Sequence, residues 1–344
     1  MFSSPAHDAG NRKLREKTMK AIRCLQYGPP ADLVLEEIDE PAPSKGKLVI
    51  ETEAAGLGYV DALLVAGRYQ VKTPLPFVPG SEVAGKVVAV GEGVSEALVG
   101  KRVMALSPVG ALAEKLALPA AACIPVPDAM SAEAAAGFIV SYCTALYGFE
   151  TCGHMKAGET VLVLGAAGGV GMAAIDVAKA MGATVVAAAS TEEKRAAAKA
   201  AGADFAIDYT KEEWRKELEP LTGRRDVDLV YDPVGGDISE TAFRCLAPGG
   251  RHLVVGFAAG DIPRIPLNLP LLKRSSIVGV DWGGHIRADP GANVPLMKTL
   301  TAWASEGRIH PEPAASYPLK EAPAVLQRLL DRESVGKPVI RFQG

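Results

Sequence analysis

Residues 161–171 of this chain read Val161-Leu162-Val163-Leu164-Gly165-Ala166-Ala167-Gly168-Gly169-Val170-Gly171. An apolar, β-branched run enters a glycine cluster, and the chain continues as the Ala-rich run 172–181 with apolar residues at helical spacing. This order predicts a strand, a tight turn and a helix, which together can bind phosphate. A pyrophosphate would bind unpaired backbone N–H groups at the positive end of the helix dipole.

The glycines of this turn have separate expected roles. Gly168 would let the backbone turn tightly at the strand end, Gly169 and Val170 would present N–H groups, and Gly171 would let helix and strand pack closely. Ala166 replaces the first glycine of the G-x-G-x-x-G fingerprint, so the motif reads A-x-G-G-x-G. Glycines in such turns can serve packing alone, but the flanking strand and helix favour cofactor binding.

The end of the next strand indicates which nucleotide binds. NAD-binding proteins place an acidic residue about 20 positions after the turn, on the ribose 2′-hydroxyl. This chain has Ser190 and Thr191 there, followed by Lys194 and Arg195. A hydroxyl group and cations suit a 2′-phosphate, so NADPH is predicted as the cofactor. The acidic residues 192–193 fit the first turn of a helix capped by Ser190 or Thr191.

Length and composition narrow the class of protein. A chain of 344 residues is too long for one ordinary core, which favours two domains. A net charge of −3 argues against a nucleic-acid partner. The sequence contains no apolar run of about 18 residues, so a membrane span is not expected. Residues 1–18 are polar and do not resemble a secretory signal, and we interpret them as a loose, disordered leader.

The cysteines and histidines are scattered. Five cysteines without C-x-x-C spacing are typical of reduced thiols in a cytoplasmic protein and leave no structural zinc lobe. The five histidines are equally dispersed, and each is interpreted as a surface or loop residue.

The pattern along the chain predicts an α/β protein. From Met19 to Pro125, short alternating runs split by Gly and Pro predict an antiparallel, barrel-like β domain with one helix near 60–66. An Ala-rich helical segment follows at 131–149. Strands then alternate with helices, which predicts a parallel sheet covered on both faces. The expected strands are 160–164, 183–189, 204–207, 227–231, 251–256 and 276–281, and the expected helices are 170–181, 192–201, 211–219 and 237–246. The remaining elements, helices near 292–306 and 320–331 and strands near 315 and 338–342, are expected to return to the first domain.

Several spaced motifs resemble one family. Residues 80–85, 166–171, 232–236, 248–251 and 336–340 resemble the medium-chain dehydrogenase/reductase superfamily, most closely its zinc-free quinone oxidoreductase, or zeta-crystallin-like, branch. The resemblance implies a GroES-like β-barrel catalytic domain (19–140 and 283–344) and a doubly wound Rossmann domain for NADPH (141–282). It also implies an active site in the cleft between them and a homodimer or homotetramer.

The resemblance also bears on metal binding. The zinc-binding branch uses Cys, His and Cys or Asp at positions that match Gly58, Ser81 and about Val140, none of which can bind zinc. Many quinone reductases carry Asn at the position of Gly58. This difference makes the substrate assignment less specific and leaves the cofactor assignment unchanged.

The resemblance implies catalytic and cofactor-binding residues. Tyr59 would donate a hydrogen bond or proton to a developing oxyanion, or would only pack against the nicotinamide. Asp61 and Tyr69 lie near it, although Asp61 can simply cap the following helix and Tyr69 can line the pocket mouth. Thr144 would lie beside the nicotinamide or bond back to a helix carbonyl. The other expected cofactor contacts are Ala167, Tyr209, Val234, Gly256, Phe257, Ala258, Arg332 and Lys337, with surface packing, a simple turn or a helix-end cation as the alternatives.

Together these features predict a zinc-independent NADPH-dependent reductase of a small-molecule acceptor, a quinone or an α,β-unsaturated carbonyl. Two alternatives stay open: an enoyl-thioester reductase of the same superfamily, and an NADPH-binding protein with little turnover. The sequence leaves open the identity of the acceptor and the size of the oligomer.

Overall fold

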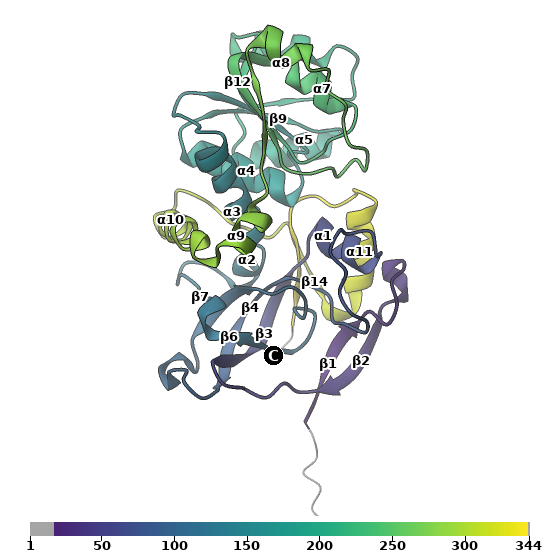
Figure 1. The fold of residues 1–344 in the computed structure, drawn as a ribbon, viewed down its shortest axis with the longest axis vertical. Coiled ribbons are helices and arrows are strands. Elements are labelled where there is room, and N and C mark those ends of the chain that lie inside the picture. The colour runs from purple at the N-terminus through teal and green to yellow at the C-terminus, as the bar shows by residue number, and fades with distance from the viewer. Residues whose placement is uncertain (1–16, 343–344) are drawn as a thin grey trace, which may run out of the picture.

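A computed structural model describes residues 17–342 and contains two large sheets (Figure 1). The expected leader lies outside the described residues, apart from Lys17 and Thr18, and the first strand, β1, already begins at Thr18. Among the described residues, no helix has the length and apolar character needed to cross a bilayer.

The upper sheet in Figure 1 is parallel throughout, as predicted. Its order, β10-β9-β8-β11-β12-β13, reverses between β8 and β11, which is the strand order of a Rossmann fold. The ligand is therefore expected outside the carboxyl ends of β8 and β11. The strands are β8 (Thr160–Leu164), β9 (Thr184–Ala188), β10 (Phe205–Ile207), β11 (Val227–Asp232), β12 (Leu246–Val254) and β13 (Ser276–Gly279).

The helices of this region agree with the prediction less closely than the strands do. The segment expected as helix 211–219 is a short 3₁₀ turn followed by α6, and the strand expected from residue 251 begins at Leu246. Two short helices, α8 and α9, were not predicted. The helices are α4 (Gly169–Ala180), α5 (Glu192–Ala200), α6 (Leu218–Thr222), α7 (Ile238–Phe243), α8 (Asn268–Lys273) and α9 (Trp282–Ala288).

The lower sheet draws its strands from both parts of the chain. Its order is β14-β15-β3-β4-β5-β7, with β6 also paired to β3, and β15 runs antiparallel to β3. The C-terminal strands thus return to the first β region, as the sequence predicted. A separate ribbon, β1-β2, lies beside it. The strands are β1 (Thr18–Arg23), β2 (Val34–Asp39), β3 (Lys47–Gly56), β4 (Glu82–Val90), β5 (Arg102–Leu106), β6 (Lys115–Pro119), β7 (Cys123–Pro125), β14 (Ala315–Pro318) and β15 (Pro338–Arg341).

Helices join the two sheets. The expected helical segment 131–149 is broken at Gly137 into α2 and α3, and α3 continues as a π-helical turn over 147–152. Helix α3 packs against α4, which in turn packs on β8 and β9 of the Rossmann sheet, and α3 also contacts β5 of the lower sheet. The division of the chain at residues 140 and 283 stays a prediction. The helices are α1 (Tyr59–Val65), α2 (Ala132–Ala136), α3 (Ile139–Leu146), α10 (Asn293–Ser305) and α11 (Ala322–Leu330).

Candidate cofactor and substrate site

The glycine turn follows β8 directly, and each glycine has a distinct geometry. Gly165 has φ +56°, a conformation that strongly favours glycine, whereas Gly168 has φ −81° and is the N-cap of α4. The expected tight turn is therefore made by Gly165, and the prediction for Gly168 was wrong because the chain reverses immediately after the strand. A Cβ on Gly171 would lie 2.3 Å from Gly165 O, so the predicted close packing is confirmed.

The start of α4 offers unpaired donors. The first helical bond runs from Met172 N to Gly168 O, so the N–H groups of Gly169 and Val170, in the first turn of α4, have no acceptor within the helix. On the other side of the turn, Ala167 O accepts a bond from Gly336 N. Free N–H groups at a helix N-terminus suit a pyrophosphate, as predicted for these residues.

The loops after β11 and β12 lie against this turn. Ala258 N donates to Pro233 O, and Gly256 N donates to Asp232 O. The Val234 side chain lies 2.8 Å from where a Cβ on Gly165 would stand. The structure therefore brings Val234 and residues 256–258 to the carboxyl edge of the sheet, next to the phosphate turn. Phe257 is 40% exposed there.

A buried carboxylate holds these loops, and the sequence did not single it out. Asp232 is 2% exposed and accepts bonds from the backbone of Val234 and Gly235, each at 2.9 Å. It also contacts Ser239 Oγ at 2.5 Å and His252 Nε2 at 3.0 Å. Although burial favours the neutral carboxyl, the bonds and charge of His252 and the bonds from Ser239 and Gly235 hold the pKa of Asp232 below its usual value.

The residues predicted to bind the 2′-phosphate follow the next strand, β9, and one of them, Lys194, contacts the C-terminal segment. Lys194 Nζ donates to Arg332 O at 2.9 Å, and Ser190 follows the end of β9. Arg332 is exposed and has φ +59°. Arg195 is engaged elsewhere, with Asp208 and Glu192 as partners. Tyr209 is partly buried against the neighbouring core.

On the barrel side, the predicted catalytic residues lie on and after α1. Asp61 is 4% exposed, and its Oδ2 accepts a bond from Gly58 N at 2.8 Å, so it caps the helix. Burial raises the pKa of Asp61, while Lys337 and the bond from Gly58 oppose that shift. This geometry favours the cap as the role of Asp61. Tyr59, half-buried, is the first residue of α1, and Tyr69 packs against the barrel core.

The positions that match the zinc ligands hold no suitable donor set. Gly58 and Val140 carry no donor side chain, and Ser81 is a poor zinc ligand. Residues 17–342 contain no group of three His, Cys, Asp or Glu side chains placed to hold a metal ion. The residues at these three positions therefore do not form the donor set of a catalytic zinc site.

The structure places a buried ion pair there. Lys337 Nζ contacts Glu82 Oε2, with 12% and 2% of the two side chains exposed, and lies 3.4 Å from where a Cβ on Gly58 would stand. Glu82 Oε1 accepts a bond from Val140 N at 2.8 Å. Glu82 was not predicted as a site residue, although it lies in the motif 80–85.

Thr144 lies one turn further along α3 and is 9% exposed. Among the described residues its hydroxyl makes no hydrogen bond to a helix carbonyl, which argues against simple back-bonding, and its expected place beside the nicotinamide stays a prediction.

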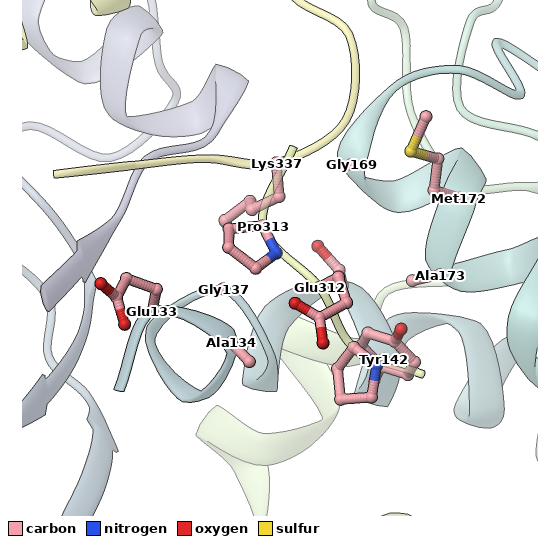
Figure 2. A pocket seen from close by; sticks show the side chains of 12 residues that line it. Glu133, Ala134, Gly137, Tyr142, Gly169, Met172, Ala173, Glu312, Pro313 and Lys337 are labelled. Atoms are coloured by element: carbon pink, nitrogen blue, oxygen red, sulfur yellow. The ribbon is translucent and has the colours of Figure 1, made fainter. Parts of the chain in front are cut away.

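A recess lies on the other side of Lys337, between α2, α3, α4 and residues 311–313 (Figure 2). Tyr142 in its wall donates to Asp176 Oδ2 at 2.8 Å, and Asp176 also accepts a bond from His310 N at 2.7 Å. These bonds tie α3 and α4 to the returning chain. The recess thus marks the junction of the two regions.

A glycine turn suited to a dinucleotide, next to a β-barrel domain, is typical of nucleotide-dependent oxidoreductases. Comparisons with known proteins agree. The family model "Alcohol dehydrogenase GroES-like domain" matches residues 44–128, and "Zinc-binding dehydrogenase" matches residues 169–299. The quinone oxidoreductase-like protein 2 homolog of Nematostella vectensis is 34% identical over 326 residues, which cover 94% of this chain and 89% of that protein.

Two solved structures resemble the whole fold. Escherichia coli quinone oxidoreductase complexed with NADPH has a TM-score of 0.84 and 28% identity, covering 94% of this chain and all of that one. The CurK enoyl reductase has a TM-score of 0.84 and 25% identity, covering 95% and 100%. The chain therefore belongs to the medium-chain dehydrogenase/reductase superfamily, in its quinone oxidoreductase-like branch.

Proposed function

We propose that this protein is a zinc-independent, NADPH-dependent reductase that transfers hydride to a quinone or an α,β-unsaturated carbonyl. The observation that carries the proposal is the pairing of a phosphate-binding turn at Gly165–Gly171 with barrel positions, Gly58 and Ser81, that lack metal donors. The relatives with quinone oxidoreductase names support the acceptor class.

The cofactor would be held along the carboxyl edge of the parallel sheet. The N–H groups of Gly169 and Val170 would bind the pyrophosphate. Ser190, Lys194 and Arg332 would bind the 2′-phosphate, with Tyr209 nearby. Thr144 and the loops carrying Val234 and residues 256–258 would orient the nicotinamide, which supplies the hydride.

The barrel side would supply the acceptor pocket. Hydride addition to a quinone or enone places negative charge on an oxygen, and a nearby O–H group lowers the barrier to that step. Tyr59, half-buried at the start of α1, is the residue placed to donate this bond or proton. Asp61 would act by holding the N-terminus of α1 through Gly58, and Tyr69 would line the pocket mouth.

Steady-state oxidation of NADPH tests the proposal. We expect turnover with 1,4-benzoquinone-type acceptors or enones, a preference for NADPH over NADH, and no loss of activity after treatment with a zinc chelator. Loss of activity on chelation, restored by zinc, would contradict the metal-free mechanism. NADPH binding without turnover on any acceptor would instead indicate a binding protein.

A second candidate is an enoyl-thioester reductase, favoured by the similarity to the CurK enoyl reductase. Both reactions add hydride to a conjugated carbonyl compound, so the same site would serve. Comparing kcat/KM for a crotonyl thioester and for a quinone separates the two, because the preferred acceptor should show the larger value.

We also propose a cytoplasmic homodimer or homotetramer. The five cysteines are all unpaired, which suits a reducing compartment. The edge strand β13 follows α8 closely in the chain, and the side chains of Leu267, just before α8, and of Leu271 and Leu272, within it, are more than 70% exposed. An open strand edge with adjacent apolar side chains is a surface that a second copy can cover.

A further inference from the structure

Lys337 contacts both the phosphate turn and the barrel region of the candidate site. It follows Gly336, whose backbone bridges to Gly168 and donates to Ala167 O in the phosphate turn. Its side chain then runs past Gly169, where an added Cβ would meet the Lys337 side chain at 3.2 Å. Figure 2 shows Lys337 between Gly169 at the start of α4 and Gly137 at the end of α2.

The ammonium end of this side chain lies in the barrel region. It pairs with Glu82, the first residue of β4, and lies 3.4 Å from the position of a Cβ on Gly58. It also favours the ionised form of Asp61, which caps α1 through Gly58 N. One cation therefore reaches from the phosphate turn to the N-terminus of the helix that carries Tyr59.

Glu82 extends the connection to a third element. Its second carboxylate oxygen accepts a bond from Val140 N, at the N-terminus of α3. A carboxylate at a helix N-terminus is favoured by the helix dipole. Because α3 carries Thr144, the ion pair links the expected nicotinamide contact to the phosphate turn.

The energetics of the pair argue for a geometric role. Burying two charges removes them from water, and a buried pair often adds little net stability compared with apolar side chains of the same size. In some proteins such pairs fix a single arrangement of the groups around them, because leaving one partner buried and unpaired is strongly unfavourable. Lys337 and Glu82 are both largely buried, and they lie where three elements of the site meet.

We propose that Lys337 is a positioning residue for hydride transfer, which through its ion pair with Glu82 fixes the phosphate turn relative to helices α1 and α3. The inference rests on the proposed reductase function. The pair acts by keeping the cofactor at a fixed distance from Tyr59 and Thr144, and it makes no bond to the reacting atoms.

The test uses three variants of the full-length protein: Lys337→Met, Glu82→Gln and the double variant. Each keeps nearly the shape of the original side chain, and the double variant removes both charges of the Lys337–Glu82 pair together. Lys115→Met is the matched control, because Lys115 pairs with Glu40 at 2.6 Å inside the barrel region, with both side chains about one quarter exposed. Tm, NADPH Kd, kcat and the isotope effect with 4-deuterated NADPH are measured for each.

We expect kcat to fall by about 30-fold or more in both single variants, since a misplacement of about 1 Å can cost about 100-fold. The isotope effect should rise as hydride transfer becomes rate-limiting. In the double variant Tm should return close to that of the wild type while kcat stays low, and Lys115→Met should keep the wild-type kcat. NADPH Kd should change by less than about threefold throughout, because the pyrophosphate donors stay in place.

Three results would overturn the proposal. If kcat recovers together with Tm in the double variant, the pair has only a stabilising role. If Lys337→Met weakens NADPH binding by more than tenfold and Glu82→Gln does not, Lys337 is a direct phosphate ligand. If the wild-type protein does not oxidise NADPH with any of the acceptors tested, the proposed function is rejected, and this inference with it. The first two results leave the proposed function intact.

Discussion

Substituting Gly171 by alanine tests the phosphate turn most directly. On the present backbone the new methyl carbon would lie 2.3 Å from Gly165 O and 2.8 Å from Ala166 Cα. Both are backbone atoms of the turn, so no side chain can move aside, and α4 must shift away from β8. Overpacking of this kind costs typically about 1–3 kcal/mol, and a clash with backbone should lie near the upper value.

Two measurements follow from that magnitude. For a domain of about 150–250 residues, each kcal/mol of lost stability lowers Tm by roughly 2–4 °C. A loss of about 3 kcal/mol should therefore lower Tm by roughly 6–12 °C. Because the N–H groups of Gly169 and Val170 move with α4, NADPH affinity, followed by fluorescence titration, should fall by more than about tenfold, or 1.4 kcal/mol.

Gly168→Ala is the matched control. Gly168 has φ −81°, and the nearest atom to an added Cβ is 3.4 Å away, so Tm should stay close to that of the wild type. If NADPH binding weakens in this variant, the loss arises from the approach of the pyrophosphate and not from the fold. A Gly171→Ala protein with wild-type Tm, or equal destabilisation by Gly168→Ala, would refute this account of the turn.

Four further predictions concern the cofactor, the chemistry, the loops and the assembly. Lys194→Ala should weaken NADPH binding by about 1–3 kcal/mol and spare NADH in titrations with both, and equal losses would contradict the 2′-phosphate assignment. Tyr59→Phe should lower kcat on quinones or enones with NADPH Kd unchanged; an unchanged kcat would leave Tyr59 a packing residue. Asp232→Asn should lower the free energy of unfolding at pH 7 by about 2–3 kcal/mol. Since the pKa of Asp232 is lowered in the folded state, its contribution is present above the unfolded pKa of about 3.9 and is lost as pH falls through the lower folded value, so wild type and variant should converge in acid denaturation experiments. Leu271→Glu should convert the proposed oligomer to monomers in light-scattering measurements, and an unchanged mass would exclude the α8 surface as the interface.

The parts of the fold that the sequence predicted are those set by local pattern. The run 160–171 combines β-branched residues, glycines and helical spacing within one continuous stretch, so the strand and the helix were expected to within one residue, and only the glycine that makes the turn was assigned wrongly. The short helices α8 and α9 were missed, because a segment of six or seven residues carries too little periodicity to be recognised.

The parts that could not be predicted depend on contacts between distant residues. The Asp232–His252 bond joins two strands, and the Lys337–Glu82 pair joins positions separated by 255 residues. No spacing rule connects such positions. The sequence offered one signal for the first case: a lone Asp at the end of a buried strand, followed by Pro and two glycines, must find bonds for its carboxylate.

Residues 332–337 give one structural reason why cofactor preference and catalysis need separate measurements. This segment is held at Arg332 O by Lys194, at Gly336 by the phosphate turn, and at Lys337 by Glu82. Lys194, the proposed 2′-phosphate ligand, therefore also secures a segment that carries Lys337. Lys194→Ala can reduce kcat through the segment even where NADH binding is spared. Arg332→Ala keeps the carbonyl that Lys194 binds and removes the side chain beyond Cβ, including the guanidinium group. A loss of NADPH affinity in that variant, at constant kcat with saturating cofactor, therefore separates recognition of the phosphate from positioning of the segment.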